Sequence, residues 1–353
     1  MKLKTIFNFL IFAAFLLTSS SYISCSSPTG PGGDTPGRRD YVWTVDTLNS
    51  PMNVLNSIWG SSPTNVWTIG PGGDANNRLF HYDGLKWTKA KGSISCTGKS
   101  LIGFNSDDIW MGGENGQIWH YDGTLWKADY EYKPINTTNV YIGDIWGTNH
   151  SDIYAVGVIT NGSDETQRGF ILHYDGIKWQ ELYRADFYSQ FQRIRKENDE
   201  IYVQAIKAGY TVSDTSEFYE LVGDNLTKIY SESNEKIYTA NLNMIGDKVY
   251  FTIGRDVYRY EATILGLKKF VKKLSFDDPN FGYQVYGRGE KDLFVRMVNG
   301  LAHYNGTDLV YMQTFNNNFT SINNTPVIFD NEVFFCGKDF INNINFVLRG
   351  KLK

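Results

Sequence analysis

Hydrophobic and polar residues alternate over short segments along most of the chain, and turn-forming residues separate these segments. Alternation with a period of two is typical of β-strands, because successive side chains point to opposite faces of a sheet. Within this pattern, a polar turn followed by an aliphatic and an aromatic residue recurs. The copies are Asn65-Val66-Trp67, Asp108-Ile109-Trp110, Asp152-Ile153-Tyr154, Glu200-Ile201-Tyr202, Lys248-Val249-Tyr250, Asp292-Leu293-Phe294 and Glu332-Val333-Phe334. Their aromatic residues lie 43, 44, 48, 48, 44 and 40 positions apart, which predicts seven units with a period near 45.

A second repeat, built on His-Tyr-Asp-Gly, predicts a hairpin inside the units. It occurs at 79–87, 117–126 and 170–179, with a weaker copy at 301–306. Asp-Gly is a strong hairpin signal, because glycine adopts positive φ without steric cost. A unit of this length holds four short strands, as the blades of a β-propeller do.

The two ends of the repeat region complement each other. The last unit has a strand at 345–350, followed only by 351–353, which is too short for a fourth strand. The segment 41–45 precedes the first unit and resembles the fourth strands at 86–89 and 178–181. We therefore predict an all-β fold, a seven-bladed β-propeller with four-stranded blades over residues 40–353. The N-terminal strand, at 40–47, is predicted to close the ring.

The N-terminal residues have the pattern of an export signal. Lys2 and Lys4 precede an apolar run over 7–17 that is too short to span a bilayer comfortably. Tyr22-Ile23-Ser24-Cys25 resembles the bacterial lipoprotein cleavage site, in which the cysteine is diacylated and becomes the new N-terminus, although that family prefers Leu where Tyr22 stands. The resemblance implies a lipoprotein signal peptide at 1–24 and lipidation of Cys25. The alternative is ordinary signal cleavage beside an incidental cysteine.

The segment that follows Cys25 is rich in Ser, Pro and Gly up to residue 39 and cannot build a core. We interpret residues 25–39 as the lipidated cysteine and a flexible tether that separates the domain from the membrane. Two acyl chains on one residue suffice for stable anchoring.

Composition narrows the range of partners. Aromatic residues make up 15% of the chain, with 34 Gly and 9 Pro, which suits strands joined by tight turns. The formal net charge is −4, and it becomes −6 when the two lysines of the signal segment are removed. Nucleic acid binding needs a basic stripe. The densest basic cluster, at 268–273, is typical of a strand edge protected by lysines, so we predict no nucleic acid partner.

Four histidines occupy equivalent positions in different units, namely His81, His120, His173 and His303. A zinc site needs three or four converging ligands, whereas equivalent positions are spread around a ring. We therefore predict hydrogen-bonded histidines beside the Asp-Gly turns, and no metal or other cofactor.

Cys96 and Cys336 fall in the first and last units, which are neighbours in a closed ring. An exported protein can form a disulfide, but a bridge needs a close approach of the two Cα atoms that a sequence does not define. Two buried thiols are the default interpretation, and a bridge is the alternative.

The chain lacks the Gly-x-Ser-x-Gly elbow, the phosphate-binding loop and the glycine-rich dinucleotide motif. Glycoside hydrolysis needs two carboxylates that face one cleft. Candidates in predicted loops are Asp74, Asp164, Glu165, Asp277 and Asp278. Because acidic loop residues are typical of any solvated surface, we assign no catalytic residue.

Loop lengths indicate the working face. The connections between the first and second strands of a unit and most of those between the third and fourth are short, whereas the others are longer and vary. In an up-and-down blade the longer class opens on one face, where binding commonly occurs. Aromatic side chains there suit stacking on a sugar or burial in a protein partner. The candidate binding residues are Tyr130, Tyr132, Phe187, Tyr188, Tyr210, Phe281, Tyr283 and Phe319; the alternative for each is packing onto the blade beneath.

The Ile-Trp-Gly, Asp-(Ile/Val)-Trp and His-Tyr-Asp-Gly-x-x-Trp units resemble those of bacterial exported β-propeller lipoproteins. The resemblance covers residues 40–353 and is strongest over 54–180. It implies a binding or scaffolding platform more often than an enzyme. Ser26 after the cysteine resembles the pattern of outer-membrane lipoproteins. The resemblance implies a location in the cell envelope, at the outer membrane, and leaves both the periplasmic side and the surface side open.

The leading hypothesis is therefore a membrane-anchored, non-catalytic propeller that binds a glycan or a protein partner through its loop-rich face. The alternative is a polysaccharide-active hydrolase or lyase on the same face, which requires an acid, a base and an arginine or metal clustered in the central cleft. A third hypothesis is a structural subunit of an envelope complex, which predicts an apolar patch on that face.

Overall fold

The structure is a computed structural model that describes residues 35–48, 54–70, 79–90, 94–163, 166–209, 212–233, 240–315 and 320–353. The first strands are β1 (Tyr41–Leu48), β2 (Ser57–Ser62), β3 (Asn65–Ile69), β4 (Leu79–Tyr82), β5 (Trp87–Lys89), β6 (Gly98–Asn105), β7 (Asp108–Gly113), β8 (Gln117–Tyr121), β9 (Trp126–Glu131), β10 (Asn139–Asn149), β11 (Asp152–Thr160), β12 (Arg168–Tyr174) and β13 (Trp179–Arg184).

The strands that follow are β14 (Gln190–Glu197), β15 (Glu200–Gly209), β16 (Val212–Val222), β17 (Asn225–Ser233), β18 (Ala240–Ile245), β19 (Lys248–Ile253), β20 (Asp256–Ala262), β21 (Lys268–Ser275), β22 (Phe281–Gly289), β23 (Asp292–Met297), β24 (Gly300–Tyr304), β25 (Leu309–Thr314), β26 (Thr320–Ile328), β27 (Glu332–Asp339) and β28 (Ile344–Leu352). Among the described residues, no helix is long and apolar enough to cross a membrane.

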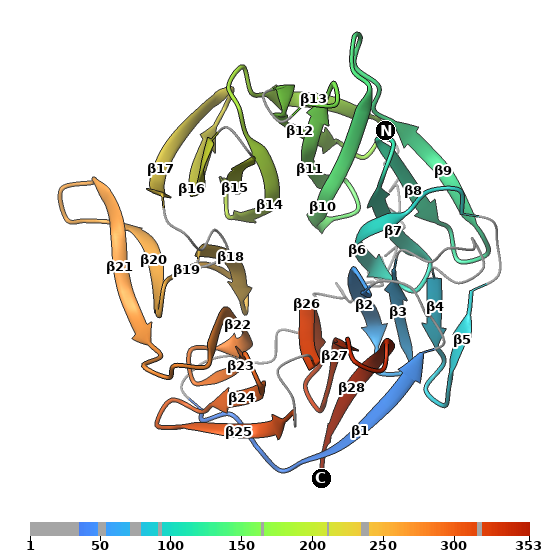
Figure 1. The fold of residues 1–353 in the computed structure, drawn as a ribbon, viewed down its shortest axis with the longest axis vertical. Coiled ribbons are helices and arrows are strands. Elements are labelled where there is room, and N and C mark those ends of the chain that lie inside the picture. The colour runs from blue at the N-terminus through green and yellow to red at the C-terminus, as the bar shows by residue number, and fades with distance from the viewer. Residues whose placement is uncertain are drawn as a thin grey trace, which may run out of the picture.

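The strands form antiparallel sheets that stand around a central axis (Figure 1). β2–β5, β6–β9, β10–β13 and β14–β17 are each a sheet of four strands in chain order. β18–β21 and β22–β25 are two further sets of four, joined by a single parallel pair between Ile245 and Gly287. In each set, or blade, the first strand lies nearest to the axis (Figure 1). The predicted all-β propeller of four-stranded antiparallel sheets is confirmed.

The remaining blade brings the two ends of the described chain together. Its strand order is β1-β28-β27-β26, so β1 is the outermost strand. The register between β1 and β28 runs from Tyr41 with Leu352 to Leu48 with Asn345. The strand predicted at 40–47 therefore lies in the blade of β26–β28, at the position of the fourth strand that residues 351–353 are too few to form.

The alternating strand directions give the blades two different ends. Connections between the first and second strands, and between the third and fourth, open at an end that we call the turn face. Connections between the second and third strands, and from one blade to the next, open at the opposite end, the loop face. The chain enters at the turn face, because Tyr41 begins β1 and pairs with Leu352, the last residue of β28.

The residues just before β1 lie against a neighbouring blade on the turn face. Gly37 N donates to Lys291 O at 2.8 Å. Arg39 donates to His303 O at 3.0 Å and pairs with Asp308 at 2.8 Å. Gly37 and Arg39, which the sequence places in the flexible tether, thus contact the β22–β25 blade.

The repeated His, Asp and aromatic residues form one hydrogen-bond network in several blades. His120 Nε2 and Asp108 Oδ1 lie 2.8 Å apart, and Trp110 Nε1 donates to the same oxygen at 2.8 Å. The imidazole stacks on the Trp110 ring, with centroids 4.2 Å apart. Equivalent contacts join His81 with Asn65, His173 with Asp152 and His303 with Asp292, at 2.6, 2.9 and 2.7 Å. Packing and hydrogen bonding within each blade therefore explain the histidine repeat.

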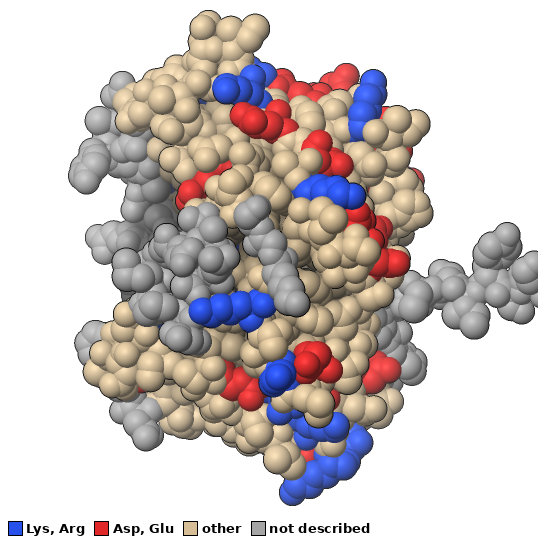
Figure 2. Space-filling view, turned by 90° about the vertical axis from the view of Figure 1, so that its right-hand side faces the viewer, with Lys and Arg blue, Asp and Glu red and all other residues tan. Residues whose placement is uncertain are grey.

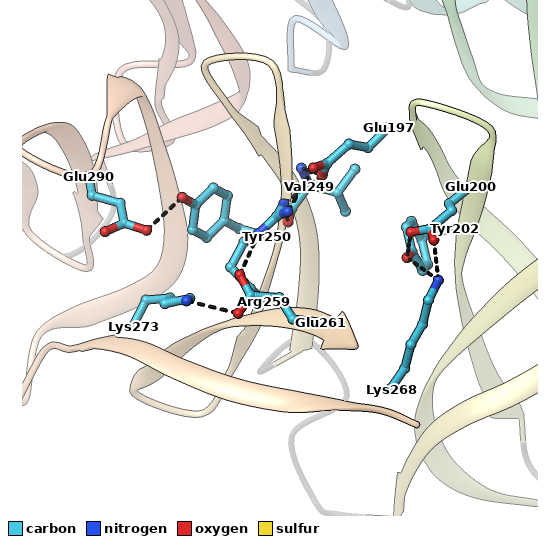
Figure 3. Close-up of polar contacts among 10 residues, drawn as sticks. All are labelled: Glu197, Glu200, Tyr202, Val249, Tyr250, Arg259, Glu261, Lys268, Lys273 and Glu290. Atoms are coloured by element: carbon cyan, nitrogen blue, oxygen red, sulfur yellow. Dashed lines mark hydrogen bonds and ion pairs between the residues drawn. The ribbon is translucent and has the colours of Figure 1, made fainter. Parts of the chain in front are cut away.

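The β14–β17 and β18–β21 blades lack this histidine and are linked by charged residues instead (Figure 3). Tyr202 Oη donates to Glu200 Oε2 at 2.6 Å, and Lys268 of the next blade pairs with Glu200. Arg259 pairs with Glu197 at 2.5 Å between the same two blades. These partly buried pairs replace the repeat where the sequence diverges from it.

Glycines of the inner strands leave room for aromatic side chains of the preceding blade. A Cβ at Gly103 would lie 2.5 Å from Trp59 Cζ2 of the preceding blade. One at Gly60 would meet Asn65 O and Val66 Cγ2 of its own blade at 2.9 Å before it met Phe329 Cζ at 3.1 Å. Because contacts shorter than 3.0 Å force a shift, the Trp59 ring explains the glycine at position 103, and the following turn and strand of the same blade explain the one at position 60.

Gly103→Ala is expected to lower the free energy of unfolding by about 1–3 kcal/mol, because the added methyl group displaces the Trp59 ring from the blade interface. Urea unfolding followed by tryptophan fluorescence measures this change. Gly143→Ala is the matched control, since its Cβ would meet nothing closer than 3.6 Å. An equal loss in both variants would contradict this packing argument.

Cys96 and Cys336 are both buried, and they are not joined in a disulfide. Burial raises the pKa of the Cys336 thiol to about 12. The thiol lies 3.3 Å from Thr68 Oγ1 in the neighbouring blade, within the core between the first and last blades. Of the two alternatives, the structure therefore has the buried thiols.

Acidic and basic side chains are interspersed over the outer wall shown in Figure 2. Among the described residues on that face, Lys and Arg lie close to Asp and Glu instead of forming a stripe of one sign. A mixed surface of this kind creates no strong field for a polyanion. It is consistent with the modest net charge of −4.

Candidate binding site in the central channel

The inner strands of the blades enclose a central cavity of about 570 Å³. Its lining residues come from β2, β6, β10, β14, β18, β22 and β26. Aromatic rings such as Trp59 and Trp146 contribute to the wall, and its charged members are Lys99, Asp144, Arg193 and Arg195. The volume lies in the range of about 300–1,000 Å³ that is usual for ligand sites, so this channel is the candidate site.

Asp144 holds three neighbouring blades together at the channel wall. Its carboxylate pairs with Arg195 at 2.5 Å, and it accepts hydrogen bonds from Ser100 Oγ at 3.0 Å and Ile194 N at 3.2 Å. Asp144 and Arg195 are only 9% and 6% exposed. A buried carboxylate with this many donors is a structural group, and its charge is already balanced.

The other two cations of the lining differ in their partners. Lys99 pairs with Glu114 at 3.2 Å. Arg193 Nη1 lies 3.4 Å from both Leu242 O and Asn243 Oδ1, and no described carboxylate contacts it. Arg193 thus brings a positive charge to the channel that only weak, neutral contacts satisfy.

Arg296, in the second strand of the β22–β25 blade, is a second arginine whose charge interacts with that of Arg193, although it is not among the residues that line the cavity. Burial lowers the pKa of the Arg296 guanidinium, Tyr286 opposes this shift, and the charge of Arg193 lowers the pKa further. Among the residues that the structure describes, none forms a hydrogen bond or ion pair with the Arg296 side chain. Arginine stays protonated under all ordinary conditions, so the charges of Arg193 and Arg296 repel each other, and no described carboxylate pairs with either of them.

An irregular stretch of β22 makes room for Arg296. Phe281 pairs with Met297 and Val285 pairs with Val295, so Arg296 alone lies opposite residues 282–284. A Cβ at Gly282 would lie 3.1 Å from Arg296 Cγ, which explains the glycine at this position.

Tyr283 lies inside this bulge with a φ of 61°, a conformation that is rare for an aromatic residue. Asn241 Nδ2 donates to Tyr283 O at 2.9 Å and holds the bulge against the neighbouring blade. Strained residues of this kind cluster at binding sites. The bulge, Arg193 in the first half of β14 and Arg296 near the end of β23 all lie toward the loop face.

Neither a protein-family model nor a curated protein sequence matches the chain. Solved structures do. One is YCF48 bound to D1 peptide, at 12% identity and a TM-score of 0.57, over 90% of this chain and 99% of that chain. Another is YCF48 from Cyanidioschyzon merolae, at 11% identity and a TM-score of 0.57, over 88% and 98%. A third is the WD40 β-propeller domain of Doa1, at 10% identity and a TM-score of 0.51, over 87% and 97%.

These similarities establish the fold. The chain is a β-propeller. Sequence identities of 10–12% do not identify a family, and a shared fold does not define a binding site.

Two of the predicted binding residues are core residues. Tyr132 is 5% exposed and packs on Phe170 with ring centroids 4.6 Å apart, and its hydroxyl contacts Glu181. Phe281 is 2% exposed and stacks on Phe276 at 5.2 Å. The expectation that these two rings are exposed on the loop face is wrong, because both fill gaps between blades.

The other predicted aromatic residues are partly buried or lie outside the described residues. Tyr130 stacks on Trp179 at 6.3 Å, and Phe187 stacks on Tyr219 at 5.8 Å. Tyr188 and Tyr283 are half-buried, and of these Tyr283 belongs to the bulge beside Arg296. Tyr210, Phe319 and the lipidation candidate Cys25 lie outside the described residues. Tyr283 is therefore the predicted residue that lies in the bulge opposite Arg296, although it does not line the cavity.

The acidic candidates do not form a pair in the channel. Asp277 is exposed and pairs with Arg255 at 2.6 Å, and Asp278 Oδ1 accepts from Asn280 N at 2.8 Å within the same loop. Asp74, Asp164 and Glu165 lie outside the described residues. Asp144 is the acid of the cavity lining, and it is paired with Arg195.

Sequence reasoning missed Arg193 and Arg296. The available signal was the run Gln190-Phe191-Gln192-Arg193-Ile194-Arg195, in which an inner strand carries several long polar side chains. Such residues are costly inside a core unless they line a cavity. The position of Arg296 depends on the bulge in β22, which no local pattern reveals.

Proposed function

We propose that the protein is a lipid-anchored, non-catalytic propeller that binds an acidic segment of a protein partner at the loop-face mouth of its central channel. The ring has seven blades, with β18–β21 and β22–β25 counted separately, and β1 closes it. Cys25 carries the anchor, and residues after it form the tether. The cell envelope is the proposed location.

The observation that carries this proposal is the pair of cations without an acid, Arg193 and Arg296. Two positive charges that repel each other at partly buried positions are unfavourable when no acid balances them. An incoming carboxylate relieves that repulsion and accepts charge-assisted hydrogen bonds from both guanidinium groups. The repulsion between the two charges therefore lowers the stability of the free protein and raises its affinity for an anion.

A protein segment suits this mouth better than a polysaccharide. The predicted stacking rings Tyr132 and Phe281 are buried, so the flat aromatic platform that a neutral sugar needs is reduced. The solved structure of YCF48 holds a D1 peptide, which gives a precedent for peptide binding in this fold. The cavity volume of about 570 Å³ leaves room for side chains of an extended segment.

The direct test is fluorescence anisotropy of labelled peptides with the mature chain. Acidic, neutral and basic peptides of one length are compared at low and high salt. We expect binding of the acidic peptides alone, and weaker binding at high salt because ions screen partly exposed charges.

The same titration with neutral polysaccharides separates the alternatives. Saturable binding of an intact glycan, without binding of acidic peptides, would overturn the peptide proposal. New reducing ends released from a polysaccharide would instead establish a hydrolase. New reducing ends together with unsaturated sugar ends would establish a lyase.

Replacing Arg296 is expected to stabilise the free protein. Arg296→Met removes one of two charges that repel each other and should raise the free energy of unfolding by roughly 1 kcal/mol. Arg195→Met is the control, since it breaks the pair with Asp144 and should lower that free energy. If Arg296→Met lowered it as well, Arg296 would be a structural residue.

A further inference from the structure

The turns at the turn face carry exposed aliphatic side chains in five successive blades. They lie between the third and fourth strands, at the outer edge of the ring. Their exposed fractions are 90% for Leu85, 46% for Leu125, 86% for Ile177 and 66% for Val222. The β20–β21 turn extends the series with Ile264, Leu265 and Leu267, at 105%, 86% and 71%.

A single exposed aliphatic residue is ordinary on a protein surface, and a repeated arrangement is not. Leu85 and Ile177 follow the positive-φ glycines Gly84 and Gly176 directly, at the tip of equivalent turns. The turns that carry Leu85, Leu125 and Ile177 are each held by an Asp whose Oδ1 accepts from the backbone, as Asp83 Oδ1 does from Leu85 N at 2.9 Å. The β20–β21 turn is held by a backbone hydrogen bond from Thr263 N to Leu267 O at 2.7 Å. These hydrogen bonds fix the tips of the four turns toward solvent.

The same face receives the N-terminal part of the chain. Gly37 and Arg39 contact the turn-face ends of the β22–β25 blade, as described above. In the β26–β28 blade, the place of the corresponding turn is taken by the entry into β1 at Tyr41. The aliphatic tips occupy the other five blades of this face.

The length of chain before the described residues limits how the ring can be oriented. Ten peptide steps separate Cys25 from Thr35, which span at most about 35 Å when fully extended. The longest inner strand, β10, has 11 residues, so the ring is of similar height, about 36 Å. A tether that starts at the turn face has no spare length to bring the loop face against the same membrane.

We propose that the turn face rests on the lipid bilayer, with Leu85, Ile177, Val222 and the Ile264–Leu267 turn inserted among the headgroups, so that the channel mouth at the loop face points away. This inference rests on the lipid anchor of the proposed function. The contact is chiefly apolar, because Asp83, Asp122 and Asp175 in the same turns offset the adjacent lysines. It therefore needs no anionic lipid and is insensitive to salt.

Environment-sensitive labels test the orientation in the acylated mature protein, reconstituted in vesicles of phosphatidylethanolamine and phosphatidylcholine. A nitrobenzoxadiazole label is attached at Ile177→Cys, at Leu265→Cys or at Ile135→Cys. Ile135 is the control, since it is 89% exposed on the β9–β10 connection of the loop face. The native Cys96 and Cys336 are buried and do not compete for the label.

We expect nitroxide lipids to quench the labels at positions 177 and 265 and to leave the label at 135 unquenched. Quenching at 135 alone, or equal quenching at all three positions, would overturn the proposed orientation. The absence of quenching at every position would overturn it as well.

Replacing the tips gives an independent measurement. In the full chain with Cys25→Ser, the combined variant Leu85→Ser, Ile177→Ser, Ile264→Ser and Leu265→Ser is expected to bind vesicles about a hundredfold more weakly than Cys25→Ser alone. Because these side chains are exposed, the melting temperature should not change. Equal vesicle binding by the combined variant and by Cys25→Ser alone would contradict the proposed contact between the turn face and the bilayer. Peptide binding at the channel is measured without vesicles, so a failure of one proposal leaves the other standing.

Discussion

A chain that lacks residues 40–47 is expected to lose its cooperative thermal transition, or to have a melting temperature lower by about 10 °C or more. The deletion removes the ladder between β1 and β28, along with the buried side chain of Tyr41. It also removes Trp43, whose ring lies against Phe335 at 6.4 Å. Each such side chain contributes about 1.5–3 kcal/mol on burial, and the open edge of β28 would invite association between molecules.

Circular dichroism during heating measures this loss. The matched control is the double variant Val42→Lys and Val45→Lys, which keeps β1 and changes side chains that are 52% and 60% exposed. Its melting temperature should stay that of the unmodified protein. A deletion variant that melts like the unmodified protein would contradict closure of the ring by β1.

Asp144→Ala is expected to lower the free energy of unfolding by about 3–5 kcal/mol, because it leaves Arg195 buried without its partner. It also removes the acceptor for Ser100 Oγ and Ile194 N, so three blades lose one common contact. For a ring of this size the melting temperature should fall by roughly 5–8 °C. Urea or thermal unfolding gives the value directly.

The double variant Asp144→Leu with Arg195→Met separates the charge effect from the packing effect. Apolar groups of similar volume often replace a buried ion pair with little loss, so this variant should recover most of the stability. A double variant as unstable as Asp144→Ala would mean that the hydrogen bonds to Ser100 and Ile194 matter more than the unpaired cation.

The repeat pattern predicted the propeller because each signal reports a local geometry. The Asp-Gly turns fix hairpins, and Gly84 and Gly123 have the positive φ that such turns require. The missing fourth strand after residue 350 and the matching segment at 41–45 predicted the position of β1. These inferences need only the period of the chain and the chemistry of its turns.

The binding residues were harder to predict, because exposure depends on contacts between blades. Tyr132 follows a fourth strand, and the sequence alone predicted an exposed side chain, yet its ring fills a gap beside Phe170. Arg296 occupies an ordinary second-strand position, and its environment arises from the bulge that opposes it in β22. Neither the packing partner nor the bulge is encoded within a few residues of the side chain concerned.

The central claim is that Arg193 and Arg296 together bind an acidic segment. Isothermal titration of the mature protein with an acidic peptide, for the unmodified chain and for Arg193→Gln with Arg296→Gln, tests it most directly. Arg255→Gln is the matched control, since Arg255 pairs with the exposed Asp277 away from the channel lining.

We expect the dissociation constant to rise about a hundredfold in the double variant, through loss of two charge-assisted hydrogen bonds, and to stay unchanged in Arg255→Gln. The melting temperature of the double variant should be no lower than that of the unmodified protein. Equal affinity of the double variant and the unmodified protein for the peptide would contradict the account.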